Sequence, residues 1–85
     1  LAVEWAGNHI RVNAIAPWYI DTPLARQVLK DQAYLNEVLK STPMKRIGKV
    51  EEVSGLVRFL CSPAAGYITG QCIAVDGGFS INLFS

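Results

Sequence analysis

The sequence predicts an α/β fold in which two parallel strands are separated by helices. Two short apolar runs, 10–16 and 71–75, end at a proline and at a glycine pair, as short strands often do. Between them, apolar residues recur at helical spacing, most clearly over 50–60. A parallel pair requires such a crossover, and the crossover is right-handed in nearly every known case.

The first run leads into a potential ligand site. Polar and apolar residues do not alternate cleanly in it, so we expect a strand covered on both faces, as in parallel sheets. Thr22 and Pro23 follow after a short loop and form a good helix start, with a capping hydroxyl and a proline at the first helical position. Ligands bind beyond the carboxyl ends of parallel strands, and helix N-termini attract phosphate. An ordinary connection that binds nothing fits the same pattern.

The remaining helices follow from spacing and breakers. Residues 1–6 resemble the end of a helix that Gly7 and Asn8 stop, and His9 is expected on the surface. Two short helices are expected over 23–30 and 31–40. Bulky apolar side chains gather near the expected ligand site: Trp18, Tyr19, Leu24, Val28 and Leu29. They favour a mobile flap that lines a pocket, and the alternative is plain surface helices packed on a core.

The second half of the chain is predicted to form a basic loop, a long helix, a strand and a tail. Thr42 and Pro43 end the preceding helix, and the loop 44–49 is expected to be solvated rather than an anion site. The strand 71–75 ends at a turn that two glycines permit. Residues 79–85 form an apolar tail, which we expect to pack on a neighbour. Its apolar residues include Ile81, Leu83 and Phe84.

Composition narrows the possible functions. The chain has 85 residues, of which 51% are hydrophobic and 18% charged, against about 25% charged in typical soluble domains. A chain this short and apolar buries a small share of its surface, so we expect a piece of something larger, or a subunit packed on partners. The net charge of +1 and the lack of a long apolar run indicate neither nucleic acid nor membrane as a partner.

The chain has two cysteines, Cys61 and Cys72, which are expected to be free, buried thiols in a reducing compartment, with a disulfide as the alternative. Their spacing does not match a metal site.

Seven short motifs, each weak alone, occur in one order along the whole chain. They are R-V-N-A-I-A-P at 11–17, I-x-T at 20–22, R-I-G at 46–48, E-E-V at 51–53, F-L at 59–60, Y-I-T-G-Q at 67–71 and V-D-G-G at 75–78. In this order and spacing the chain resembles the C-terminal third of the short-chain dehydrogenase/reductases. The residues within and around these motifs are similar to the tropinone-reductase-like branch found in plants.

The resemblance implies a fold and a cofactor. The chain is then the C-terminal part of a Rossmann-type, doubly wound parallel sheet of seven strands, with 10–16 as the sixth and 71–75 as the seventh. Residues 1–85 are expected to be the C-terminal segment of a single NAD(P)-binding domain, incomplete as a domain. The implied activity is carbonyl reduction or alcohol oxidation, with NADP as the cofactor and NAD as the lesser alternative.

The resemblance also assigns residues to a cofactor site. Pro17 and Ile20 match positions that flank the nicotinamide, and the backbone of Ile20 matches the group that holds its carboxamide. Thr22 matches a hydroxyl that reaches the cofactor's phosphates, and the N–H of Leu24 lies in the same turn. Trp18 departs from the family's common glycine, although the tropinone-like branch shares the departure. Together with two further residues of the substrate flap, Val28 and Leu29, it is expected to face a small hydrophobic ketone or alcohol.

No catalytic residue is expected in the chain. The family's glycine-rich loop and its catalytic serine, tyrosine and lysine lie upstream of the matched region, and neither Tyr34 nor Tyr67 stands in a Tyr-x-x-x-Lys context. The isolated chain is therefore expected to be catalytically silent and to bind cofactor poorly. No metal site is expected. A homo-oligomer, dimer or tetramer, is implied through the helix 50–60, the strand 71–75 and the tail.

Two alternatives to this function stay open. One is a truncated, non-enzymatic relative that acts as a binding or interaction module. The other is a 3-oxoacyl or sugar-alcohol reductase of the same fold. Cytoplasmic residence is expected, with organellar import as an open possibility.

Overall fold

The computed structural model describes residues 1–82. Its elements are α1 (Ala2–Trp5), the 3-10 turn η1 (Ala6–Asn8), β1 (Ala14–Pro17), α2 (Pro23–Val28), α3 (Gln32–Ser41), α4 (Val50–Leu60), the 3-10 turn η2 (Pro63–Ala65), β2 (Cys72–Val75) and α5 (Phe79–Asn82). The expected helices and both expected strands are therefore present. Of the predicted apolar tail, Leu83 and Phe84 lie outside the described residues.

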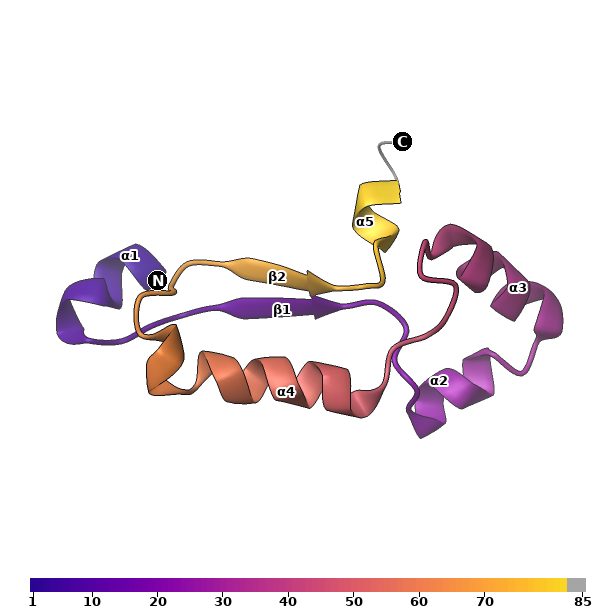
Figure 1. Ribbon diagram of the computed structural model, residues 1–85, viewed down its shortest axis with the longest axis horizontal. Helices are drawn as coiled ribbons and strands as arrows, with labels where there is room; N and C mark the ends of the chain where they lie inside the picture. Colours follow the sequence, from indigo (N-terminus) through magenta and orange to yellow (C-terminus); the bar gives the residue numbers. More distant parts are fainter. Residues whose placement is uncertain (83–85) are drawn as a thin grey trace.

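The two strands pair in parallel, as predicted. Ala14 lies opposite Cys72 and Pro17 opposite Val75. Figure 1 shows α1 near the amino ends of the strands, α4 alongside β1, and α2, α3 and α5 beyond the carboxyl ends. The helices that follow each strand thus meet at one end of the sheet, which is where parallel sheets bind ligands. Among the described residues, no helix is long and apolar enough to cross a bilayer.

The first strand is shorter than predicted, because its expected first half bonds to a loop. The N–H of Val12 donates to Oγ1 of Thr69 at 3.0 Å. The Asn13 amide donates to the carbonyl of Ile68 at 3.1 Å and accepts from the N–H of Gln71 at 3.1 Å. Side chains therefore replace ladder hydrogen bonds before Ala14, where regular pairing begins.

The prediction that this strand is covered on both faces is wrong for the described residues. Three of its four residues are exposed, and only Ile15 is half-buried. Among the described residues, the buried apolar side chains are few: Leu29, Val38, Leu60 and Ala65. Cys61 and Cys72 are free, as predicted, but both are exposed rather than buried. Cys61 follows the end of α4, and Cys72 lies on the uncovered sheet, so no second layer hides either thiol.

The helix starts follow the predicted capping chemistry. Oγ1 of Thr22 accepts from the N–H of Ala25 at 3.2 Å and caps α2, with proline at its first position. Oδ1 of Asp31 accepts from two N–H groups at the start of α3. The end of the first helix differs in detail: the left-handed residue is the exposed His9, with φ 62°, rather than a residue of the expected stop.

Candidate cofactor and substrate site

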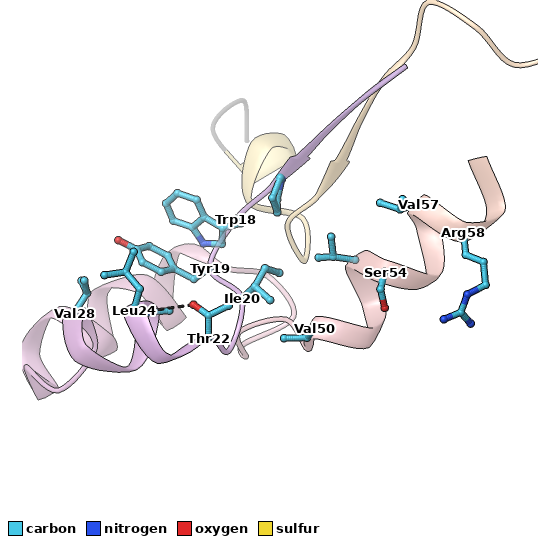
Figure 2. Close-up of a pocket in the computed structure, with 13 residues that line it drawn as sticks. Trp18, Tyr19, Ile20, Thr22, Leu24, Val28, Val50, Ser54, Val57 and Arg58 are labelled. Carbon is cyan, nitrogen blue, oxygen red and sulfur yellow. Dashed lines mark hydrogen bonds between the residues drawn. The ribbon is translucent and has the colours of Figure 1, made fainter. Parts of the chain in front are cut away.

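An open groove of about 790 Å³ lies at the carboxyl end of β1, between α2 and α4 (Figure 2). Its lining is formed by Pro17, Trp18, Tyr19, Ile20, Thr22, Leu24, Ala25, Val28, Val50, Val53, Ser54, Val57 and Arg58. The volume falls in the range of small-molecule sites, and the predominantly apolar walls are typical of them.

The groove brings together six of the seven residues that the sequence assigned to the site: Pro17, Trp18, Ile20, Thr22, Leu24 and Val28. The seventh, Leu29, does not line it and is 8% exposed, packed in the small core. Leu29 follows the last residue of α2, and its side chain points about 100° away from that of Val28 if the helical geometry continues. Here Val28 faces the groove and Leu29 faces inward.

The loop after β1 is held by a glycine whose role the sequence analysis missed. The N–H of Gly48 donates to the carbonyl of Tyr19 at 2.8 Å, and the N–H of Asp21 donates to the carbonyl of Gly48 at 2.9 Å. A Cβ on Gly48 would lie 2.6 Å from Cδ1 of Ile20, so a larger residue there would displace the end of that side chain. The R-I-G motif was the available signal, since it places this glycine opposite the loop.

The hydroxyl of Thr22 is positioned for a ligand as well as for the helix. It is half-buried, lines the groove and uses its oxygen to accept from α2 at 3.2 Å. A hydroxyl both donates and accepts, so its hydrogen can be donated to an anionic oxygen. The N–H of Leu24 lies in the first turn of α2, where backbone donors have no partner within the helix.

Aromatic side chains form the wall of the groove on the side of the second strand. The ring of Trp18 stacks on Phe79 with centroids 3.6 Å apart and planes at 8°, and it meets Tyr19 edge-on at 4.9 Å. The hydroxyls of Tyr19 and Tyr34 share a hydrogen bond, which raises the pKa of Tyr19. A phenol with a raised pKa keeps its proton at neutral pH, which is the opposite of the tuning expected for a catalytic tyrosine. Tyr67 is fully exposed.

Two ion pairs lie near the groove. Arg26 Nε lies 2.6 Å from Asp21 Oδ1 and lowers the pKa of that carboxyl. Arg46 NH1 lies 2.7 Å from Glu52 Oε1, and this pair with the N–H of Lys49 lowers the pKa of Glu52 to about 2. Lys45, Arg46 and Lys49 are all exposed, so the basic loop is solvated, as predicted.

The groove can bind and orient, but it offers no acid–base pair for catalysis. Its walls fit a planar apolar ring, and its hydroxyl and backbone donors fit an anion. A dinucleotide with a nicotinamide ring and a pyrophosphate presents both features. Among residues 1–82 there is also no group of three His, Cys, Asp or Glu side chains that could hold a metal ion.

Comparison with known proteins places the chain in a family. A family model described as enoyl-(acyl carrier protein) reductase matches residues 1–80. Two tropinone reductase homologues of Arabidopsis thaliana are similar to the chain. One is 55% identical over 85 residues, all of this chain and 31% of the relative. The other, described as chloroplastic, is 57% identical over 84 residues, 99% of this chain and 26% of the relative. The chain thus spans about a third of the length of the curated relatives it matches.

Solved structures agree in fold. A putative short-chain alcohol dehydrogenase from Sinorhizobium meliloti is 46% identical with a TM-score of 0.87, over 95% of this chain and 32% of that one. A putative 2-deoxy-d-gluconate 3-dehydrogenase from Agrobacterium tumefaciens, with bound NADP, is 41% identical with a TM-score of 0.91, over 94% and 32%. The predicted Rossmann-type architecture is therefore confirmed. On these matches, the chain belongs to the short-chain dehydrogenase/reductase family of oxidoreductases.

Proposed function

We propose that residues 1–85 form the C-terminal segment of the nucleotide-binding domain of an NADP-dependent carbonyl reductase of the tropinone-reductase type. In this proposal the chain supplies part of the cofactor cradle, the substrate flap and a subunit surface. The observation that carries it is the convergence of six assigned residues on one groove at the carboxyl end of β1. NADP rather than NAD is supported by the names of similar structures, among them a gluconate 5-dehydrogenase in complex with NADP and tartrate, and an NADPH-dependent reductase.

Each cradle residue has a physical task in this proposal. Pro17 and Ile20 pack against the two sides of the nicotinamide ring, and the backbone of Ile20 orients its carboxamide. Thr22 donates its hydroxyl hydrogen to a phosphate oxygen, and the N–H of Leu24 adds a second donor from the same turn. When bound, the cofactor supplies or accepts the hydride. Proton transfer is assigned to residues that this chain does not supply.

The substrate in this proposal is a small hydrophobic ketone or alcohol. Trp18 and Val28 line the groove with apolar surface, and Val53 and Val57 of α4 face them across it. Such walls exclude water from the reacting carbon. A polyhydroxylated sugar fits them less well, because each hydroxyl that is buried without a partner costs free energy.

The exposed apolar surface supports the remaining parts of the proposal. On α4, Val50, Val57 and Phe59 are 49%, 41% and 44% exposed. We assign the covering of this surface to the rest of the domain and to a second copy in a dimer or tetramer. We also propose that the protein resides in the cytoplasm.

A chimeric enzyme tests the proposed function. In it, residues 1–85 replace the matching part of the 55%-identical Arabidopsis relative. We expect the chimeric enzyme to bind NADPH and to oxidise it when a small hydrophobic ketone is present. Binding is measured by titration calorimetry and turnover by absorbance. A chimeric enzyme that folds but binds no NADPH contradicts the proposal.

Substitution of Thr22 sharpens this test. Thr22→Val removes the donor, and hydrogen bonds to charged groups are worth about 1.5–3 kcal/mol, so NADPH affinity should fall about 10- to 100-fold. Thr22→Ser is the matched control, because serine keeps both the helix cap and the donor. Thermal unfolding without cofactor measures the part of the effect that belongs to the cap. Equal NADPH affinity in the valine and serine variants would exclude the assigned role.

A further inference from the structure

Two consecutive aromatic residues after β1 hold both ends of the flap helix α3. Nε1 of Trp18 donates to Oγ1 of Thr42 at 3.1 Å, directly after the last residue of α3. The hydroxyl of Tyr19 is hydrogen-bonded to that of Tyr34 in the first turn of the same helix. The loop that lines the groove is therefore attached to α3 at two points, one buried and one exposed.

The buried attachment has a defined direction. An indole N–H donates only, so Oγ1 of Thr42 accepts from Trp18. The hydroxyl of Thr42 then donates its own hydrogen to the carbonyl of Val38 at 2.7 Å. Thr42 is 1% exposed, so water cannot readily replace either bond if one is lost. The chain of hydrogen bonds leads from the groove wall into the backbone of α3.

The opposite sides of Trp18 and Thr42 are packed as well. The indole ring stacks on Phe79, the first residue of α5. The methyl group of Thr42 lies against the turn after β2, where a Cβ on Gly77 would approach it to 2.9 Å. Neither Trp18 nor Thr42 can therefore shift without a shift in the elements that follow the second strand.

We propose that Trp18 and Thr42 act as one positioning unit: their hydrogen bond fixes the C-terminal end of α3 and holds the Trp18 ring in the groove wall, and so sets the space that is left for the ketone. This inference rests on the proposed function and deepens it, since it names the residues that set the substrate space. Trp18 contributes one ring face to the stack and one donor to the flap, and it also lines the groove. A displacement of the C-terminal end of α3 would therefore also displace Trp18 in the groove wall.

Hydrogen–deuterium exchange of the chimeric enzyme without cofactor tests the inference. The variants are Trp18→Phe, which keeps an aromatic ring but loses the donor, Thr42→Val, which keeps the shape but loses the hydroxyl, and Thr42→Ser, which keeps the hydroxyl. The first two should raise exchange in α3 by at least about fivefold, because each removes the hydrogen bond between Trp18 and Thr42 that holds the end of the helix. Thr42→Ser should exchange as the unchanged chimeric enzyme does. The double variant Trp18→Phe with Thr42→Val should exchange no faster than Thr42→Val alone, because both act on one chain of bonds.

The outcomes separate this inference from the proposed function. Exchange in α4 is the internal reference, and an equal rise in α3 and α4, or no rise in α3, overturns the inference. Additive effects in the double variant overturn it too, as does a serine variant that behaves like valine. In an active chimeric enzyme, Thr42→Val should raise the KM for the ketone by a larger factor than it lowers kcat. Because exchange is measured without cofactor or substrate, it decides the positioning role even if the chimeric enzyme is inactive.

Discussion

Substitution of Gly77 by alanine tests how the end of the flap lies on the turn after β2. Gly77 has φ 58°, and an added Cβ would lie 2.9 Å from Cγ2 of Thr42 and 3.4 Å from Cβ of Met44. The N–H of Met44 also donates to the carbonyl of Gly77 at 3.0 Å, so the two segments cannot easily separate. The left-handed conformation costs alanine about 1–2 kcal/mol, and overpacking typically adds about 1–3 kcal/mol. We expect Gly77→Ala to lower the free energy of unfolding of the chimeric enzyme by about 2–5 kcal/mol.

The same substitution at Gly55 is a matched control with the opposite sign. Gly55 lies in the middle of α4, and apart from the helix's own backbone and the adjacent residues, no atom of the described residues lies within 4 Å of a Cβ placed there. Alanine in a helix interior is favoured over glycine by about 0.5–1 kcal/mol, so Gly55→Ala should stabilise. Urea unfolding followed by circular dichroism measures both changes. A neutral or stabilising Gly77→Ala would refute the described packing of the flap end. A destabilising Gly55→Ala would show that another surface covers α4 at that point.

Three further predictions concern single side chains. The pKa of Glu52 is lowered from 4.5 to about 2 by Arg46, so the carboxylate stabilises the fold above about pH 4.5 and this contribution is lost as the pH falls through about 2. Thermal unfolding of Glu52→Gln should lack this acid-dependent part, and an unchanged pH profile would exclude the ion pair. Tyr34→Phe should return the pKa of Tyr19 toward 10.0, as NMR titration of labelled tyrosine can show; a pKa that stays raised would exclude the hydroxyl pair as its cause. Leu29→Ala should cost about 2–4 kcal/mol in urea unfolding, because the side chain is buried, and a smaller loss would place it outside the core.

Local chemistry made the helix boundaries predictable. Thr22 and Asp31 each satisfy backbone donors of their own helix, and the residue before Pro43 ends α3. These effects operate within a few residues, so the sequence alone contains them. The parallel strand pair followed from two apolar runs separated by helices, and the family followed from the order of the seven motifs. The convergence on one groove was also foreseeable, because the loop after a parallel strand and the next helix start are neighbours in this fold.

The missed features depend on residues that are distant in the sequence. The stack of Trp18 on Phe79 has no local signal, and the R-I-G motif marks Gly48 without showing that it approaches Ile20. The inward direction of Leu29 was hidden because α2 is too short to show which side of it is apolar. The exposure of Cys61 and Cys72 was missed because apolar neighbours in the sequence do not show whether another layer of the structure covers a side chain.

The parallel pairing of β1 with β2 has a consequence for the order of folding. The backbone N–H of Gln71 donates to Oδ1 of Asn13, which lies 58 positions earlier in the chain. All helices of the crossover lie between these two residues. Closing so long a loop is entropically costly and slow relative to helix formation. During synthesis the first strand leaves the ribosome well before its partner exists. The nascent chain must therefore carry β1 without its partner β2 until the crossover has been translated, so the pairing of β1 with β2 forms late in this segment.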